Sequence, residues 1–487
     1  MIFDEPTSAL DFESSAKFLR ETVKKRTCWQ TKEKWLSVWY TYYINCRRSF
    51  FMMGKQSGQI QMVILDIDSM IPEDHLLRRI KNCVNFDFIY EKAAPYYSHI
   101  GRKSIDPVVL IKMLLIGYLY GIKSERRLEE EVSLNLAYRW FCGIDLMHRV
   151  PDHSTFSQNR RRRFQEAGIF REIFNEIVLK CIELGIVSGE TGVADGSFLP
   201  SNVAWDSRYE TVETVQRSTV KYMEELEAEL SSIPGYREPE NIKKEKESLK
   251  SRTDPECGYI HQARKKGLGY LAEMTVDTSH GIITGVDCYP ANQRESDIIL
   301  EHLKGQPCKY QEIGLDGGYD IGAVYRGLEL LGVQGYTAIR EYQNNAMKKG
   351  FCYEEETDRF VCRQGEYLAF QKLIYKKSTQ NYYRLYSRSK KQCKNCPYFS
   401  ACATDLGTVR INASAYYPSF YRNSRKVGTS DYLRVMRLRK IWAEGTFAVL
   451  KREHKLNKIQ KRGLQKAIEE CLLSATALNL KRLVKAV

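Results

Sequence analysis

Three acidic residues occupy positions that suit metal chemistry on nucleic acid. Asp195 lies in TGVADGS and Asp316 in IGLDGGYD, each directly after a short apolar run that predicts a β-strand. Glu444 lies in RKIWAEGTFAVLK, a helical pattern in which Phe447 and Lys451 share its face. Mg²⁺ prefers oxygen ligands, and two such ions held by three carboxylates can cut a phosphodiester bond by in-line attack. Taken singly, an Asp at a strand end more often caps a turn, so the prediction depends on the three acids together.

A group of cysteines predicts a second kind of metal site. Cys393, Cys396 and Cys402 lie in QCKNCPYFSAC, and Cys362 lies upstream in DRFVCRQGE. Four thiolates that include one CxxC pair suit a structural tetrahedral Zn²⁺ site. The alternative is that they are free thiols of a core, and Cys352 is a substitute for Cys362 in the set. The chain has 14 cysteines and opens with no secretion signal, which favours a reducing compartment.

The spacing of apolar residues divides the chain at about residue 188. Over residues 65–165 apolar residues recur at helical spacing, which predicts a helical N-terminal region. Over 188–485 the pattern predicts strand, hairpin, helix, strand, helix and strand, an order typical of an RNase H-like α/β core. A helical insertion over 206–250 and a Cys-rich insertion over 345–425 are expected to interrupt this core. The expected fold class is therefore α/β.

Several shorter segments carry specific expectations. Ser279-His280-Gly281 predicts the turn of a hairpin between LAEMTVDT and GIITGVDCY. Within the first insertion, YMEELEAELSSI and KKEKESLK are both expected to be helical. The longest apolar run, Val108 to Tyr120, is too short to span a bilayer and contains Lys112, so it predicts a buried helix and no membrane partner.

The charge of the chain favours a polyanionic partner. Its 487 residues include 75 Lys plus Arg against 60 Asp plus Glu, a net charge of +15. Such an excess favours nucleic acid over a membrane surface. After PDHSTFSQN, where Asp152, Ser154 or Thr155 can cap a helix, four basic residues follow as a candidate DNA-binding face. These residues are Arg160, Arg161, Arg162 and Arg163. A solvated basic face without a partner is the alternative.

Together these motifs resemble the catalytic blocks of bacterial insertion-sequence DDE transposases. VADGSF, GLDGGYD and the helix of Glu444 carry the resemblance, with PEDHLLR, PDHSTFSQNRRR and ANQRESD as further blocks. It extends from about Gly54 to the C-terminus, and the cysteines resemble the Cys-rich insertion of one branch. Related families place Tyr seven and Arg four residues before the Glu, where this chain has Arg437 and Lys440. Lys440 keeps the charge but lacks the bidentate fork of an arginine.

The resemblance implies a mechanism and partners. Asp195, Asp316 and Glu444 would hold two Mg²⁺ ions, with Mn²⁺ as a substitute, while Lys440 and Lys451 would contact DNA. The enzyme would cut double-stranded DNA at the element's terminal inverted repeats and join the freed 3′ end to target DNA. It would act as a homo-oligomer in a bacterial cytoplasm. The alternatives are an inactive transposase-derived DNA-binding protein and an RNase H-like nuclease without strand transfer.

The first residues resemble a different class of protein. MIFDEPTSALD is similar to the Walker B and D-loop segments of ABC-transporter ATPases. The sequence contains no GxxxxGK[ST] loop to hold phosphates, so no nucleotide is expected. We interpret residues 1–27 as an ATPase-like remnant and residues 28–60 as read-through sequence that is not expected to fold. The transposase itself is expected to start near Met52, Met53 or Met62.

Overall fold

A computed structural model gives the fold of most of the chain. It describes residues 66–98, 100, 104–122, 124–164, 168–217, 222–239, 242–262, 265–339, 350–403 and 408–487. All of these residues belong to one unit, 66–487. The segments expected over 1–27 and 28–60 lie outside the described residues.

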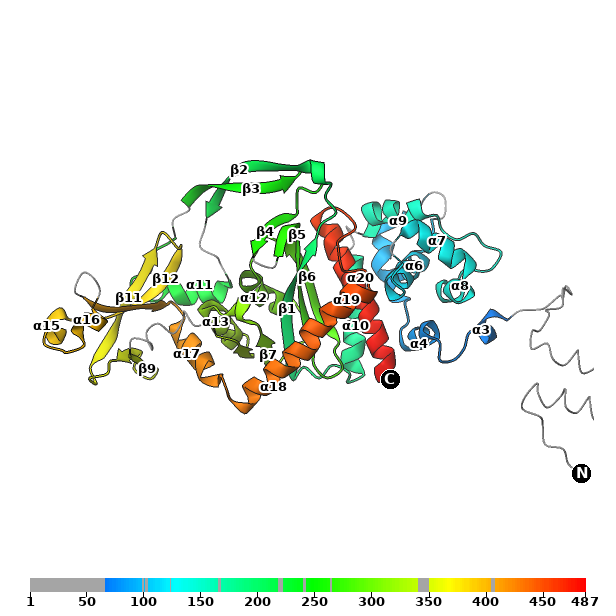
Figure 1. The fold of residues 1–487 in the computed structure, drawn as a ribbon. Coiled ribbons are helices and arrows are strands. Elements are labelled where there is room, and N and C mark those ends of the chain that lie inside the picture. Colours follow the sequence, from blue (N-terminus) through cyan, green and yellow to red (C-terminus); the bar gives the residue numbers. More distant parts are fainter. Residues whose placement is uncertain are drawn as a thin grey trace, which may run out of the picture. The chain divides into compact units, whose positions relative to one another are not determined.

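Up to Phe164 the regular elements of the described chain are all helices (Figure 1). They are α3 (Ile67–Met70), α4 (Leu76–Cys83), α5 (Phe88–Ala93), η1 (Ala94–Tyr96), α6 (Pro107–Leu119), α7 (Glu125–Leu134), α8 (Leu136–Cys142), α9 (His153–Asn159) and the π-helical η2 (Arg160–Phe164). Asp106 begins α6 by accepting hydrogen bonds from the N–H groups of Val108 and Val109. Helix α6 is buried on almost all sides, which explains why its sequence is apolar apart from Lys112. Asp152 caps α9, one of the three caps that the sequence offered.

Six strands form the central sheet. They are β1 (Thr191–Pro200), β4 (Gly258–Gln262), β5 (Lys265–Asp277), β6 (Ile283–Pro290), β7 (Glu312–Leu315) and β8 (Gln334–Thr337). Strand β5 is antiparallel to β1, β4 and β6, whereas β1, β7 and β8 run parallel. The predicted hairpin is confirmed by the pairing of β5 with β6. Strands β1 and β7 pair only from Thr191 and Glu312 to Val193 and Gly314, so their ladder ends just before Asp195.

Helices cover both faces of this sheet. Helices α12 (Glu295–Lys304) and α13 (Gly322–Leu330) share one apolar core with the sheet. On the other face lie α10 (Ile169–Glu183) and α20 (Leu464–Ala486) (Figure 1). Successive residues of β1 enter different cores, because Val193 belongs to the core that includes α10 and α20, while Ala194 belongs to the core of α12 and α13. This alternation determines toward which face of the sheet each later side chain of β1 points.

The first insertion departs from expectation. It contains η3 (Trp205–Ser207), β2 (Arg208–Arg217), α11 (Glu224–Ser231) and β3 (Ile242–Ser251). Helix α11 confirms the expectation for YMEELEAELSSI, but the helix expected in KKEKESLK is wrong, because this segment is part of β3. A run of Lys and Glu has no apolar stripe for a helix to bury. Pairing with β2 along the whole strand satisfies its backbone groups instead, so the insertion over 206–250 is mainly a two-stranded ladder.

The Cys-rich segment forms a second sheet. Its strands are β9 (Cys352–Glu354), β10 (Arg359–Val361), β11 (Tyr367–Lys376), β12 (Asn381–Arg388) and β13 (Val409–Ser414). They pair antiparallel in the order β13-β12-β11-β10-β9. The short helices α15 (Lys390–Cys393) and α16 (Phe399–Cys402) lie between the last two strands. Aromatic packing builds the core, with the ring of Phe360 centred 4.9 Å from Tyr386 and 5.1 Å from Tyr353.

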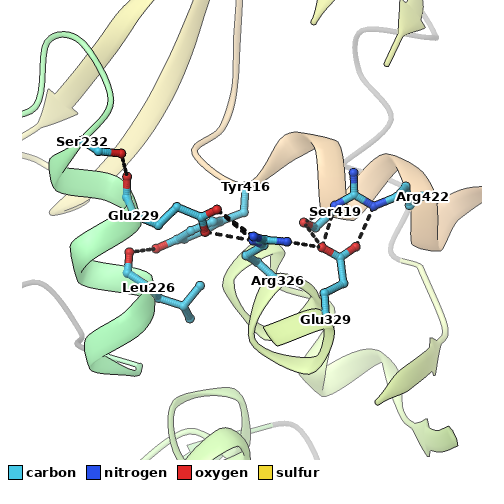
Figure 2. Close-up of polar contacts among 8 residues, drawn as sticks. All are labelled: Leu226, Glu229, Ser232, Arg326, Glu329, Tyr416, Ser419 and Arg422. Carbon is cyan, nitrogen blue, oxygen red and sulfur yellow. Dashed lines mark hydrogen bonds and ion pairs between the residues drawn. The ribbon is translucent and has the colours of Figure 1, made fainter. Parts of the chain in front are cut away.

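Ion pairs join both inserted segments to α13 (Figure 2). Arg326 of α13 donates to Glu229 of α11 at 2.8 Å and to Glu329 at 3.0 Å. Glu329 also accepts hydrogen bonds from Ser419 and Arg422 of α17 (Tyr417–Lys426). Burial alone would raise the pKa of Glu329, but these hydrogen bonds hold it below its ordinary value. The network therefore ties α11 and α17 to a helix of the central core.

A helical run near the C-terminus packs against the sheet where β1 and β7 separate. It consists of α18 (Ser430–Arg439), the π-helical η6 (Lys440–Glu444) and α19 (Gly445–Glu453). Helix α18 contacts β1 and β7, and η6 contacts β1 and β5. Within the described ranges, no helix has the length and apolar content needed to cross a membrane.

Candidate active site

The two strand acids lie at neighbouring strand ends. Asp195 is in β1, two residues beyond its last pairing with β7, and Asp316 directly follows β7. The Asp316 carboxylate accepts a hydrogen bond from the N–H of Gly318 at 2.6 Å and caps η4 (Gly317–Tyr319). Both side chains are half-buried. The crevice at the carboxyl ends of parallel strands, at the point where the strand order reverses, is a common binding position in α/β sheets.

Arg439 brings the helix acid to the strand acid. Its Nη2 donates to Glu444 Oε1 at 3.1 Å, and its Nη1 lies 3.8 Å from Asp195 Oδ2. One guanidinium therefore contacts carboxylates from the strand and from the helix. The sequence indicated Lys440 as the cation here, but its side chain is exposed. Sequence reasoning missed Arg439, because its position depends on the π-helical turn that follows it.

Lys451 faces the strand that carries Asp195. Its Nζ donates to Ser197 Oγ at 2.7 Å, and Ser197 lies two residues beyond Asp195 on the same face of β1. Phe447, one turn earlier, is buried beneath the helix. The helix side that carries Phe447 and Lys451 therefore faces β1, as the sequence predicted.

A buried acid that sequence reasoning missed completes the surroundings. Glu273 of β5 lies opposite Gly196 in the sheet and is fully buried. Tyr319 donates to Glu273 Oε1 at 2.5 Å, while Oε2 has no hydrogen-bond partner among the described residues. Burial raises the pKa of Glu273 well above its usual value against the effect of Tyr319, and nearby carboxylates, including Asp195, act in the same direction as burial. The sequence does contain an indication of this site, because Glu273 is an acidic residue within the apolar run LAEMTVDT.

The donor set fits a divalent cation. Asp195, Asp316 and Glu444 offer carboxylate oxygens from three separate elements, the ligand type that Mg²⁺ prefers. Beside them, Glu273 Oε2 is a buried acceptor for which the described residues provide no donor. Gathered carboxylates repel one another unless a cation lies among them. The ligand type therefore suits a metal ion, whereas among the described residues the carboxylate oxygens of these three acids do not all lie within 4.8 Å of one another.

The four predicted zinc ligands lie near one another at the second sheet, but among the described residues no three of their sulfur atoms lie within 4.8 Å of one another. Cys396 N–H donates to the carbonyl of Cys393 at 3.0 Å, which closes the turn of the CxxC pair. Burial raises the pKa of Cys393 and of Cys402. The nearby thiols of Cys362 and Cys396 raise the pKa of Cys393 and of Cys402 further. Cys352, the proposed substitute, is exposed in β9.

The predicted basic face is only partly on the surface. Arg160 is 4% exposed, and its guanidinium forms ion pairs with Glu125 and Glu469. This corrects the expectation of an Arg160 that faces DNA, because a buried acid of α20 takes up its charge. Arg163 donates to Asn159 at 2.7 Å and lies over the ring of Tyr97. The side chains of Arg161 and Arg162 lie outside the described parts of the structure.

A separate acidic group lies in the helical region. Ligand atoms of Glu129, Asp152 and His153 all lie within 4.8 Å of one another. Glu129 Oε2 lies 2.9 Å from His153 Nδ1 and also accepts a hydrogen bond from the His153 N–H. These contacts anchor the start of α9, where Asp152 is the cap, and they involve none of the three predicted acids.

Comparison with known proteins identifies two regions. Residues 65–162 match the family described as Transposase domain (DUF772), and residues 361–484 match the family described as Transposase DDE domain. The second match includes Glu444 and Lys451 and begins after Asp316. A search of curated proteins gave no match.

One solved structure aligns over most of the chain. It is described as the piggyBac transposase synaptic complex with hairpin DNA, and it covers 84% of this chain and 82% of that chain at 11% identity. Its TM-score is 0.28, too low to support an argument about this chain. The assignment rests on the two matched domains, which identify this chain as a DDE transposase, an enzyme that cuts and joins DNA.

Proposed function

We propose that this transposase serves an insertion sequence and that Asp195, Asp316 and Glu444 are its metal-binding acids. The observation that carries the proposal is the position of Arg439, whose guanidinium contacts both Asp195 and Glu444. The strand order β6-β5-β1-β7-β8, with β5 alone antiparallel to the rest, supports an RNase H-like core. In such a core, acids on the first strand, after the fourth strand and on a later helix lie near one crevice.

The residues present suggest how the chemistry is divided. When bound, Mg²⁺, or Mn²⁺ in its place, would activate the attacking water or 3′-OH and stabilise the leaving oxygen. Asp195 and Asp316 would hold it from the strand ends, and Glu444 from the helix. Arg439 contacts both Asp195 and Glu444 here, and in the DNA complex its fork would turn to a phosphate. Lys451, held at Ser197, would contact a second phosphate at the same edge.

The substrate follows from charge and domain content. The net charge of +15 supports a double-stranded DNA partner bound mainly through phosphates. The helical region that includes residues 65–162 would bind the terminal inverted repeats, with Arg161, Arg162 and Arg163 as candidate contacts. Residues 188–485 would form the catalytic domain, with Lys440 on its surface. A homo-oligomer on DNA would hold two element ends together.

The cysteine cluster has a structural role in this proposal. Cys362, Cys393, Cys396 and Cys402 would hold one Zn²⁺ between the second sheet and its short helices. This insertion lies between Asp316 and Glu444 in the chain, and the network of Arg326 ties it to the core. Zinc would thus stabilise the insertion without taking part in the reaction.

A cleavage and joining assay tests the three acids. Asp195→Asn, Asp316→Asn and Glu444→Gln should each abolish metal-dependent cleavage of an element-end duplex, because each removes an anionic ligand. DNA binding should persist, since the basic surface is untouched. Glu301→Gln, an exposed acid on α12, is the matched control. Normal cleavage by any of the three variants would remove that residue from the site, and cleavage by the wild type without joined product would indicate a nuclease.

A further inference from the structure

Glu295 is a fourth acid beside the strand ends. It is the first residue of α12, which covers the face of the sheet opposite α10 and α20. Asp195 and Ser197 of β1 face the helices that carry Arg439 and Lys451. Gly196 between them therefore presents the other face, toward α12. Glu295 thus approaches the same strand from the side opposite Glu444.

Two glycines leave space for the Glu295 carboxylate. A Cβ atom on Gly196 would lie 2.7 Å from Glu295 Oε1, and a Cβ on Gly318 would lie 2.9 Å from Glu295 Oε2. The Cβ on Gly318 would also lie 2.7 Å from Asp316 Oδ1, so an oxygen of each acid approaches the same point. Neither glycine has a positive φ angle, so backbone conformation does not demand glycine at these positions. The close approach of the Glu295 carboxylate is what requires glycine at these two positions.

The strand pairing explains how the carboxylate reaches this position. Strands β1 and β7 are hydrogen-bonded only as far as Val193 and Gly314. Beyond that point lie Asp195 on one strand and Asp316 after the other, with no ladder between them. The Glu295 carboxylate lies beside the glycines that follow these two acids, Gly196 and Gly318. It therefore approaches the same point as the Asp316 carboxylate and lies beside the residue that follows Asp195 in β1.

A second observation indicates that a ligand belongs at this cluster. Glu273 lies opposite Gly196, is fully buried, and has an Oε2 atom without a partner among the described residues. The charges of Glu295, Asp195 and Asp316 all act on it. A bound cation would be stabilised beside a buried acceptor oxygen that lacks a donor and has three further carboxylates near it.

The helix dipole alone does not explain Glu295. An acid in the first turn of a helix is stabilised by the partial positive charge there. Asp297, also in the first turn of α12, can be stabilised in the same way. That stabilisation explains the residue type but not why glycine occurs at both chain positions that meet the Glu295 carboxylate.

We infer that Glu295 is a further carboxylate ligand of the metal centre, reaching from α12 to the ion held by Asp195 and Asp316. This inference rests on the proposed function, because it assumes that Asp195 and Asp316 hold the ion. The centre would then be bounded by Glu444 on one side of the sheet and by Glu295 on the other. Metal affinity would depend on four carboxylates instead of three.

Metal binding by the full chain, without DNA, tests the inference. Mn²⁺ binding is measured by calorimetry, together with the rise in melting temperature that Mn²⁺ produces. Glu295→Gln should weaken Mn²⁺ binding by roughly tenfold or more and should remove most of the thermal shift. The melting temperature without metal should stay the same or rise, because carboxylate repulsion is relieved. Glu301→Gln, exposed on the same helix, should bind Mn²⁺ as the wild type does.

Gly196→Ala provides a second variant that keeps every acid. Its new Cβ would press on the flexible Glu295 side chain and displace it, so this variant should also bind Mn²⁺ more weakly. Wild-type Mn²⁺ affinity in Glu295→Gln, with weakened binding in Asp195→Asn and Asp316→Asn, would overturn the inference and leave the proposed function intact. Wild-type affinity in all three acid variants would overturn both.

Discussion

Arg439 and Glu444 are five residues apart, yet the arginine Nη2 lies 3.1 Å from the glutamate Oε1. On an α-helix, residues three or four apart share a face. The π-helical turn of Lys440–Glu444 widens the helix, so that residues five apart share a face there instead. Lys440, four residues before Glu444, is turned to solvent. The π turn therefore selects which basic residue contacts the acid.

Replacing Arg439 should impair catalysis more than DNA binding. In Arg439→Gln the Glu444 carboxylate loses the group that holds it toward Asp195, so cleavage should fall by roughly tenfold or more. Arg437→Gln, exposed on the same helix, is the control and should cut normally. The measurements are single-turnover cleavage and duplex binding at one salt concentration. A normal cleavage rate for Arg439→Gln would show that Glu444 is oriented by another group.

We expect Arg160 to contribute to the free energy of unfolding and not to DNA binding. Its guanidinium pairs with Glu469, whose side chain is 2% exposed, so Arg160→Ala would leave this buried acid with Lys461 as its remaining cationic partner. Loss of one member of a buried ion pair typically costs about 3–5 kcal/mol. Urea unfolding of the full chain measures the loss, and Arg126→Ala, an exposed arginine of α7, should change stability little. If Arg160→Ala unfolds like the wild type but loses DNA affinity, the residue contacts DNA after all.

The strand acids could be predicted from sequence because their signal is local. Asp195 and Asp316 each follow an apolar run that forms a strand, and the hairpin of β5 and β6 follows from its turn residues. Helices α12 and α13 are likewise present where apolar spacing predicted them. In these segments, local pattern and tertiary packing favour the same structure.

Other features depend on tertiary contacts and could not be predicted. Glu295 has the sequence features of an ordinary acid at a helix start, and only the approach of Gly196 and Gly318 shows where its carboxylate lies. The burial of Arg160 depends on Glu469, which is 309 positions later in the chain. The strand in KKEKESLK requires its partner β2, because its own sequence has no strand-like alternation of apolar residues.

The cysteine cluster should contain metal. Purified protein should carry about one zinc per chain, and Cys393→Ser combined with Cys396→Ser should lose it and lower the melting temperature. Cys83→Ser, at a half-buried thiol of the helical region, is the control and should keep the zinc. Elemental analysis and thermal unfolding are the measurements. A zinc-free wild type that is as stable as the zinc-loaded protein would contradict the site and favour free core thiols.

His454 should make the protein sensitive to acid. It follows α19, is fully buried, and its Nδ1 lies 2.9 Å from the carbonyl oxygen of Tyr118. Burial, aided by the charge of Lys481, lowers the pKa of His454 from 6.5 to about 4. Between these two pH values the unfolded chain binds a proton that the native protein does not, so stability falls as pH falls through this window. The full loss of stability is about 3 kcal/mol, and it is reached below the pKa that His454 has in the folded protein.

A variant that cannot titrate isolates this contribution. His454→Asn retains an N–H group near the Nδ1 position and should flatten the loss of stability between pH 6.5 and about 4, even though the smaller side chain lowers stability at every pH. The comparison is needed because burial raises the pKa of Glu470 to about 7, and that shift makes stability fall with rising pH over part of the same range. Urea unfolding at several pH values gives the two slopes, and His148→Asn, at an exposed histidine, should match the wild type. Equal slopes for His454→Asn and the wild type would mean that His454 takes up its proton in the native protein, with the imidazolium accommodated beside Lys481.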